Sequence, residues 1–371
     1  MTQWRTFPLG AAIELAYGKS LPKGSRVESG SIPVYGSNGI TGWHDTAVVN
    51  GPTVIVGRKG SAGAVQFVDG PCFPIDTTYY ARPREGFDFD IKFLFYLLRQ
   101  LDLSRLKTAT GVPGLTREDA YRETIPVPPL PEQRRIVDLL SRAEGIVRLR
   151  REAEKKAAEL IPALFLNMFG DPATNPKGWP VAKIGTVTSV QTGATPSRDN
   201  PAYYLDAGIP WVKTGEVSGD VIFDTEEKIS RAALAKTNCK VFPVDTILVA
   251  MYGQGQTRGR CAVLGIPAAS NQACAAILPS DNISVAYLFC FLKTQYEQLR
   301  GMAHGGNQAN LNLSMIKGLP FILPPLSAQR AFAEKLESIS SIQIQQSTAT
   351  AKAQATFDAL LASVFNDRGG N

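Results

Sequence analysis

The sequence predicts an α+β protein: two similar mixed α/β globules joined by two long helices, which form an antiparallel coiled coil with pseudo-two-fold symmetry. Three observations predict it. A proline-rich segment occurs twice, a long amphipathic stretch follows each copy, and short β-type segments precede each copy. The copies are Ile125–Ile136 (IPVPPLPEQRRI) and Phe321–Phe332 (FILPPLSAQRAF). A repeat of this kind is typical of a molecule that presents one structural unit at two places.

The two copies keep a constant offset through everything that follows the prolines. Four residue pairs are each 196 positions apart (325 − 129 = 196): Pro129 and Pro325, Gln133 and Gln329, Arg134 and Arg330, Phe169 and Phe365. The paired prolines favour an extended, stiff entry into each helix, because a residue that precedes proline avoids helical geometry.

Composition is that of an ordinary globular protein. The chain has 371 residues, enough for two or three domains, with 44% apolar and 19% charged residues. We find no apolar run long enough to span a bilayer and no signal-peptide core near the N-terminus, so we expect a cytoplasmic protein. The five cysteines lack a Cys-x-x-Cys pair and are expected to be reduced core or surface thiols. A net charge of +6 permits a polyanionic partner.

Each half opens with short β-type segments separated by Gly, Pro, Asn and Asp. Ser31–Tyr35 corresponds to Gly208–Val212, and Thr53–Val56 corresponds to Thr246–Val249. A helical stretch follows in both halves. We therefore expect a first globule, a first long helix, a second globule and a second long helix, at residues 1–128, 129–170, 171–324 and 325–371.

The long helices carry apolar residues at heptad spacing. The expected seam of the first helix is Ile136, Leu139, Ala143, Ile146, Ala153, Ala157, Leu160 and Leu164, with a flanking stripe at Leu140, Val147, Ile161 and Met168. Adding 196 gives a weaker version of both in the second helix. A helix of about 35 residues is roughly 50 Å long and must bury its stripe, and its own repeat is the nearest equal partner. The antiparallel sense follows because a globule must fit between the end of one helix and the start of the next. Two ordinary core helices are the alternative, which the shared register disfavours.

The second half carries further ordered motifs ahead of its proline segment. They are Gln191–Arg198 (QTGATPSR), Gly208–Val212 (GIPWV), Asn271–Ala273 (NQA) and Leu313–Ser314 (LS); the first half has a weaker form of the first motif at Ala16–Leu21 (AYGKSL). In this order, and with the proline segment and long helix given twice, the chain resembles the specificity subunits of type I restriction–modification systems over nearly its whole length.

The resemblance implies a function. Each globule would be a target-recognition domain that reads one half of a bipartite double-stranded DNA target, and the helices would set the gap between the halves. The chain would dock two methyltransferase subunits and translocase/nuclease subunits of a phage-defence system. It would be non-catalytic and hold no cofactor or metal, since S-adenosylmethionine, ATP and Mg are expected on the partner subunits. The motif residues Pro129, Gln133, Arg134, Pro325, Gln329 and Arg330 are candidates for helix entry or partner-subunit contact.

Base readout in a DNA groove favours Arg, Lys, Asn and Gln on loops, whereas Lys, Ser, Thr and backbone amides hold phosphates. Two loops in each globule have this composition, at residues 57–63 and 107–111 and at residues 252–260 and 304–310. The candidate DNA-binding residues are Arg58, Lys59, Ser61, Lys107, Thr108, Thr110, Lys213, Gln254, Gln256, Thr257, Arg258, Arg260, Asn307, Gln308 and Asn310. A solvated hairpin turn is the alternative for the Gly-Arg-Lys-Gly loop.

Catalytic alternatives lack the residues they need. The two histidines, His44 and His304, fall in polar loops of different globules, too isolated for a triad or a zinc site. Gly18-Lys19-Ser20 is not a P-loop, because Ile13 stands where that motif requires glycine. A second functional hypothesis remains open: a coiled-coil scaffold whose globules bind a non-DNA partner such as a protein or a glycan.

Overall fold

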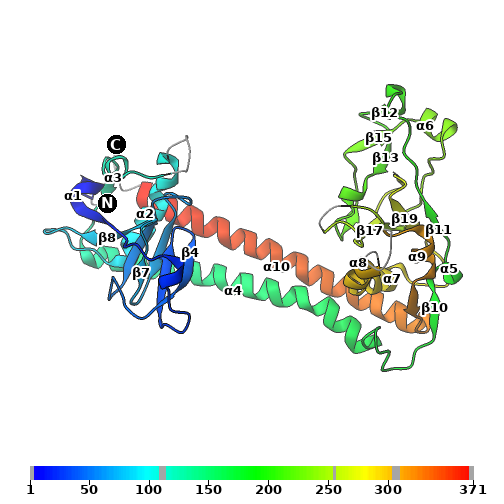
Figure 1. The fold of residues 1–371 in the computed structure, drawn as a ribbon, viewed down its shortest axis with the longest axis horizontal. Helices are drawn as coiled ribbons and strands as arrows, with labels where there is room; N and C mark the ends of the chain where they lie inside the picture. The colour runs from blue at the N-terminus through cyan, green and yellow to red at the C-terminus, as the bar shows by residue number, and fades with distance from the viewer. Residues whose placement is uncertain (1–3, 108–113, 254–255, 303–309, 367–371) are drawn as a thin grey trace. The chain divides into compact units, whose positions relative to one another are not determined.

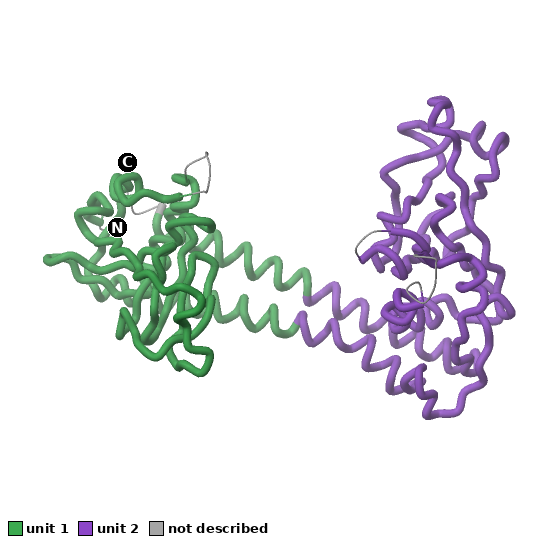
Figure 2. The backbone as a smooth tube through the Cα atoms, in the orientation of Figure 1, with its two compact units in different colours: residues 1–153, 347–371 green, residues 154–346 purple. Residues whose placement is uncertain are grey.

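The computed structural model describes residues 4–107, 114–253, 256–302 and 310–366 (Figure 1). The chain divides into two compact units (Figure 2). Unit 1 is Met1–Ala153 with Ser347–Asn371, and unit 2 is Glu154–Gln346. Each long helix therefore contributes one part to each unit.

Unit 1 is built on a four-stranded antiparallel sheet of order β2-β8-β5-β6 and a three-stranded sheet of order β4-β3-β7. A third, two-stranded pairing joins β1 to β9. The strands are β1 (Thr6–Pro8), β2 (Ile13–Tyr17), β3 (Ile32–Gly36), β4 (Gly39–His44), β5 (Thr53–Gly57), β6 (Val65–Val68), β7 (Phe73–Pro74), β8 (Thr78–Pro83) and β9 (Thr124–Pro126). The helices are α1 (Leu9–Ala12), η1 (Lys23–Ser25), α2 (Ile91–Leu101), η2 (Leu103–Leu106) and α3 (Arg117–Tyr121).

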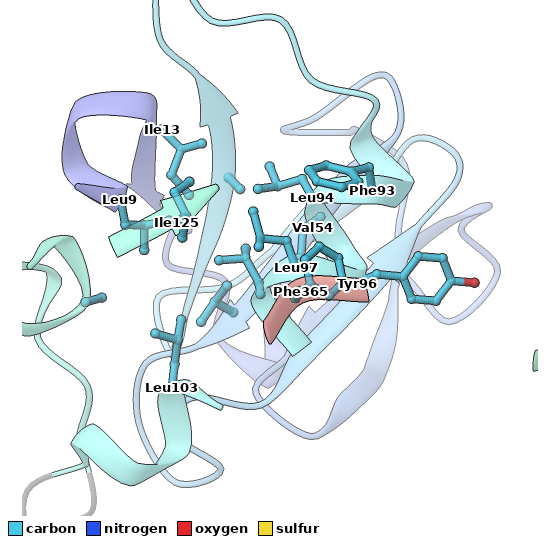
Figure 3. Close-up of a cluster of buried hydrophobic side chains, with 14 of the residues drawn as sticks. Leu9, Ile13, Val54, Phe93, Leu94, Tyr96, Leu97, Leu103, Ile125 and Phe365 are labelled. Atoms are coloured by element: carbon cyan, nitrogen blue, oxygen red, sulfur yellow. The ribbon is translucent and has the colours of Figure 1, made fainter. Parts of the chain in front are cut away.

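The core of unit 1 lies between the larger sheet and α2. Every residue of β5 is buried, as expected for a central strand rich in β-branched residues. Asp90 caps α2 by accepting hydrogen bonds from the backbone N–H groups of Lys92 and Phe93. Figure 3 shows Val54 of β5, Leu97 of α2 and Phe365 from the second long helix within this cluster.

Unit 2 repeats this plan. Its five-stranded sheet has the order β11-β19-β16-β17-β14, its four-stranded sheet has the order β12-β15-β13-β18, and β10 pairs with β20. The strands are β10 (Val181–Lys183), β11 (Val190–Thr192), β12 (Tyr204–Leu205), β13 (Ile209–Val212), β14 (Val221–Ile222), β15 (Glu227–Ile229), β16 (Ile247–Ala250), β17 (Cys261–Leu264), β18 (Ala269–Ser270), β19 (Cys274–Ile277) and β20 (Pro320–Ile322). The helices are α5 (Ile184–Val187), η3 (Pro201–Tyr203), η4 (Thr214–Glu216), α6 (Arg231–Lys236), α7 (Val285–Thr294), α8 (Tyr296–Met302) and α9 (Leu313–Gly318).

The duplication holds at the level of strand pairing. The order β2-β8-β5-β6 in unit 1 matches β11-β19-β16-β17 in unit 2, and both runs are antiparallel throughout. In the smaller sheets, β3 pairs in parallel with β7 as β13 pairs in parallel with β18. The predicted fold class of two similar mixed globules is confirmed, and the extra strands β12 and β14 are part of what lengthens the second globule.

The long helices are α4 (Leu130–Phe169) and α10 (Leu326–Asn366). In unit 1, Leu140 near the start of α4 shares a core with Phe357 near the end of α10. In unit 2, the rings of Phe165 and Phe169, at the end of α4, contact Phe332, near the start of α10, with centroids 5.8 and 5.4 Å apart. The start of each helix thus meets the end of the other, so the predicted antiparallel pairing is confirmed within each unit.

Three of the eight residues of the predicted seam in α4 are wrong. Leu139, Ile146 and Leu160 are 40%, 55% and 42% exposed, whereas the flanking residues Leu140 and Val147 are buried. Leu139 and Ile146 are seven residues apart, and so are Leu140 and Val147, so both pairs satisfy the heptad spacing of a coiled coil. Packing against the globule determines which stripe is buried, because Leu140 and Val147 belong to the core of unit 1. The same correction applies in α10, where Ile342 is 43% exposed.

All five cysteines are free and buried, so the expectation of core or surface thiols narrows to core thiols. Burial raises the pKa of Cys72 and Cys290 to about 11, and of Cys261 and Cys274 to about 12. Below the unfolded thiol pKa of about 8.5, both states keep these protons and the folded state has its full stability. As pH rises from there toward 11 or 12, the unfolded state releases protons that the folded state retains, so the free energy of unfolding falls.

Within the described residues, no helix has the length and apolar character needed to cross a membrane.

We expect the folded protein to resist an aromatic disulfide reagent at pH 7.5, because buried neutral thiols do not attack. Spectrophotometric titration should find almost no reactive thiol in buffer and all five in guanidinium chloride. Rapid reaction of even one thiol in buffer would contradict the burial.

Candidate nucleic-acid interface

The first candidate loop, residues 57–63, is fixed at several points. It leaves the end of β5, and the backbone N–H groups of Arg58 and Lys59 donate to the carbonyl of Thr77 at 2.9 and 3.2 Å. The backbone N–H of Leu115 donates to the carbonyl of Arg58 at 2.9 Å. The loop is thus tied to two other chain segments and differs from a simple solvated hairpin turn, while Lys59 and Ser61 remain exposed.

An aromatic and cationic cluster, which the sequence did not reveal, lies against this loop. The guanidinium carbons of Arg58 and Arg117 lie 5.2 and 4.4 Å from the ring centroid of Tyr17. The Tyr17 ring lies 5.2 Å from that of Tyr79, whose hydroxyl donates to the carbonyl of Leu115 at 3.0 Å. Arg117 is the first residue of α3, whose N-cap is Thr116, and it is not among the residues that the sequence predicted to bind DNA.

The second candidate loop, residues 252–260, is anchored to α8. The hydroxyl of Tyr296 donates to the backbone carbonyl of Gln256 at 2.7 Å and accepts from Nη1 of Arg300 at 2.7 Å. Within the loop, Nη2 of Arg260 donates to Oε1 of Gln256 at 2.8 Å. These bonds hold the loop while leaving the Gln256 side chain exposed.

A cavity of about 510 Å³ opens beside this loop. Three cationic side chains and a single carboxylate are among its lining groups: Arg260, Lys293, Arg300 and Glu297. The excess of positive charge suits an anion, and DNA phosphates are held by such groups.

The two loops are equivalent, and the equivalence is visible in two glycines. Gly63 and Gly259 have φ angles of 81° and 85°, a region that side chains other than glycine rarely adopt. A Cβ atom at Gly63 would lie 2.3 Å from the backbone N of Ser104, and one at Gly259 would lie 3.4 Å from Cβ of Leu299. Leu103 and Leu299 are both buried, and 259 − 63 and 299 − 103 both equal 196. The offset of the long helices therefore extends into the candidate loops.

The remaining candidates differ in their surroundings. Nζ of Lys213 pairs with Glu226 at 2.8 Å and with Glu227 at 3.0 Å, and the hydrogen bonds that it donates to these carboxylates raise its pKa. Its charge is thus compensated inside unit 2.

Exposed or partly exposed candidates are Lys107, Thr257, Arg258 and Asn310. Five candidates and one histidine lie outside the described residues: Thr108, Thr110, Gln254, Asn307, Gln308 and His304. His44 ends strand β4, contrary to the predicted loop position.

The motif glutamines occupy the entry of each long helix. Gln133 is fully buried; its Nε2 donates to the carbonyls of Pro128 (2.8 Å) and Asp88 (2.9 Å), and its Oε1 accepts from the backbone N–H of Asp90 at 2.8 Å. Gln329 repeats this with the Pro324 carbonyl (2.8 Å) and the backbone N–H of Ser284 (2.9 Å).

Asp90 and Ser284 are the N-cap residues of α2 and α7. Each glutamine therefore ties a long helix to the start of the helix that covers its sheet. The neighbouring motif residues Pro129, Arg134, Pro325 and Arg330 are exposed.

Residues 1–159 and 176–354 match the family model described as the type I restriction modification DNA specificity domain. The chain belongs to this family. This confirms the predicted class, a DNA-specificity subunit of a type I restriction–modification system that is not itself the catalyst, and favours it over the scaffold with a non-DNA partner.

Known proteins of the class are similar to the chain over much of its length. It is 22% identical to the type I restriction enzyme MjaIX specificity subunit of Methanocaldococcus jannaschii, over 74% of this chain and 67% of that protein. It is 26% identical to the HindI specificity subunit of Haemophilus influenzae, over 52% of this chain and 42% of that protein. The chain thus aligns with between roughly two fifths and two thirds of these relatives.

Solved structures share the fold. The type I restriction-modification S subunit from M. genitalium has a TM-score of 0.62 at 17% identity, covering 98% of this chain and 96% of the other. A chain from a study of type I R-M complex assembly and conformational transition has a TM-score of 0.66 at 20% identity, covering 98% and 97%. Both are similar in architecture to this chain along nearly its whole length.

Proposed function

We propose that the chain recognises a bipartite double-stranded DNA target, with unit 1 contacting one half-site and unit 2 the other. The observation that carries this proposal is the equivalence of the two loops at Gly63 and Gly259, each placed after a central buried strand and packed against a short helix, η2 for Gly63 and α8 for Gly259. Loops with Arg, Lys and Gln on a rigid support suit readout of base edges and phosphates. Repetition of such a loop suits a target with two parts.

We further propose that two methyltransferase subunits and translocase/nuclease subunits dock on this chain. Leu139, Ile146 and Leu160 recur at heptad spacing on one side of α4 and are exposed, which is unusual for a helix whose other side is already paired. The exposed Arg134 and Arg330 mark the equivalent helix entries. The methylation and cleavage chemistry, with S-adenosylmethionine, ATP and Mg, would then belong to the partners.

A genome-wide map of methylated adenines tests this function. Cells would express the chain with the methyltransferase subunit of its own system. We expect a split motif of two short half-sites with a fixed unspecified gap. If the methyltransferase is active with another specificity subunit but produces no new methylation with this chain, the proposal is wrong.

The loop of unit 2 yields a prediction about one half-site. Gln256→Ala or Arg258→Ala should weaken binding to the half-site read by unit 2 by about 1–3 kcal/mol, because a bidentate base contact discriminates by that amount. Titration against duplexes in which one half-site at a time is scrambled would measure the effect. Arg231→Ala, an exposed arginine at the start of α6, is the control. Equal weakening of both half-sites would contradict the assignment of this loop.

A further inference from the structure

Two arginines of unit 1 share one aromatic ring. The guanidinium carbon of Arg117 is 4.4 Å from the centroid of Tyr17, and that of Arg58 is 5.2 Å away. Both lie within the range of favourable cation–π contact. Because the two cations approach the same ring, their mutual repulsion opposes the arrangement unless an anion binds beside them.

The charge of these arginines is not compensated within the described part of unit 1. Their Nε atoms are buried without a hydrogen-bond partner, and no carboxylate forms an ion pair with either. Asp119, on the same short helix as Arg117, pairs instead with Arg122 at 3.3 Å. The exposed Lys59 adds a further positive charge to the same loop.

Unit 2 contains an arginine that lies over aromatic rings and whose charge is compensated by a carboxylate. Arg198 lies 4.3 Å from the ring centroid of Tyr204 and 5.4 Å from that of Trp211. Its Nη1 pairs with Glu227 at 2.6 Å. Arg198, which lies over two aromatic rings, is thus accompanied by a carboxylate, whereas within the described residues no carboxylate pairs with Arg58 or Arg117.

We propose that Arg58 and Arg117 form a paired-guanidinium site on Tyr17 that binds one backbone phosphate of the DNA beside the half-site read by unit 1. This inference rests on the proposed function. Contact with the Tyr17 ring restrains both guanidinium groups in advance, and the planar fork of arginine matches the oxygens of a phosphate. Two cations held on one ring favour an anionic oxygen over the neutral edge of a guanine, which a single guanidinium would satisfy.

The test uses the full chain with its methyltransferase subunit and a duplex carrying the target found by the methylation map. Affinity is measured at several salt concentrations for the parent and for Arg58→Gln/Arg117→Gln. We expect the slope of log affinity against log salt to fall in magnitude by about 0.9, the value for one phosphate contact. Arg122→Gln removes one positive charge at the C-cap of the helix that carries Arg117 and should leave the slope unchanged.

A scan with single methylphosphonates, which are uncharged, locates the phosphate. One position near the unit 1 half-site should weaken binding by the parent and by the Arg122 variant, but not by the double variant. Such a cycle isolates one contact from general changes in charge. Tyr17→Leu, checked for folding by circular dichroism, should also lose the sensitivity at that position.

Two results would overturn the inference. An unchanged salt slope with unchanged methylphosphonate sensitivity would show that the arginines do not contact a phosphate. An unchanged slope with relaxed preference at one base pair would show a base contact instead. If the parent complex itself failed to bind any DNA, the proposed function would fail, which is a different result from either.

Discussion

Removing one facing heptad from each long helix should shorten the gap between the two half-sites by about three base pairs and leave the half-site sequences unchanged. The segments are residues 148–154 of α4 and 349–355 of α10, which contain the pair Arg151 and Gln354, joined by a 2.8 Å hydrogen bond. Seven helical residues rise about 10.5 Å, and successive base pairs are separated by about 3.4 Å. Val147 and Phe357 stay in place, and Ala353 is the one deleted residue among those described that packs against the core of either unit.

The deletion must be a whole heptad in both helices. Removing three or four residues would rotate the buried stripe away from its partner, and removing a heptad from one helix would misalign the facing residues. The methylation map again gives the measurement, and insertion of a heptad at the same positions should lengthen the gap by about the same amount. A gap that stays constant in both variants would refute the idea that the helices act as a spacer.

Much of the architecture could be predicted because it is written twice. A constant offset of 196 from Pro129 to Phe169 can persist only if the two helices are under the same constraints, and this predicted their equivalence and pairing. The choice between Leu139 and Leu140 for the seam could not be made, since both stripes have heptad spacing. The decision comes from the globule core, which collects residues from distant parts of the chain.

The sequence indicated which loops carry the candidate DNA-binding residues, but it did not indicate which side chains contact one another there. Arg117 and Tyr17 are a hundred positions apart in sequence, so nothing local indicates that they meet. Lys213 has the composition of a DNA contact, yet two carboxylates of the following strand region compensate its charge. For Gln133 the motif allowed either helix entry or partner contact. Its burial and three hydrogen bonds favour helix entry.

Gln133→Ala should destabilise unit 1 by about 2–4 kcal/mol. The substitution leaves the backbone N–H of Asp90 and the carbonyls of Asp88 and Pro128 without their partner, and a buried unpaired polar group costs about 1–3 kcal/mol. Gln329→Ala should act in the same way on unit 2, through Ser284 and Pro324. The loss also frees the entry of the long helix from the N-cap of the helix that covers the sheet.

Hydrogen exchange followed by mass spectrometry separates the two effects, because each variant should accelerate exchange in the helix it anchors, α2 for Gln133 and α7 for Gln329. Arg134→Ala and Arg330→Ala are the matched controls: both side chains are exposed, and such changes usually stay within about 0.5 kcal/mol. Gln133→Glu should be at least as damaging as alanine, since a carboxylate would face two carbonyl oxygens without a proton to donate. If the glutamine variants were as stable as the arginine variants, the hydrogen bonds of Gln133 and Gln329 would not stabilise the start of the long helices, and this prediction would be wrong.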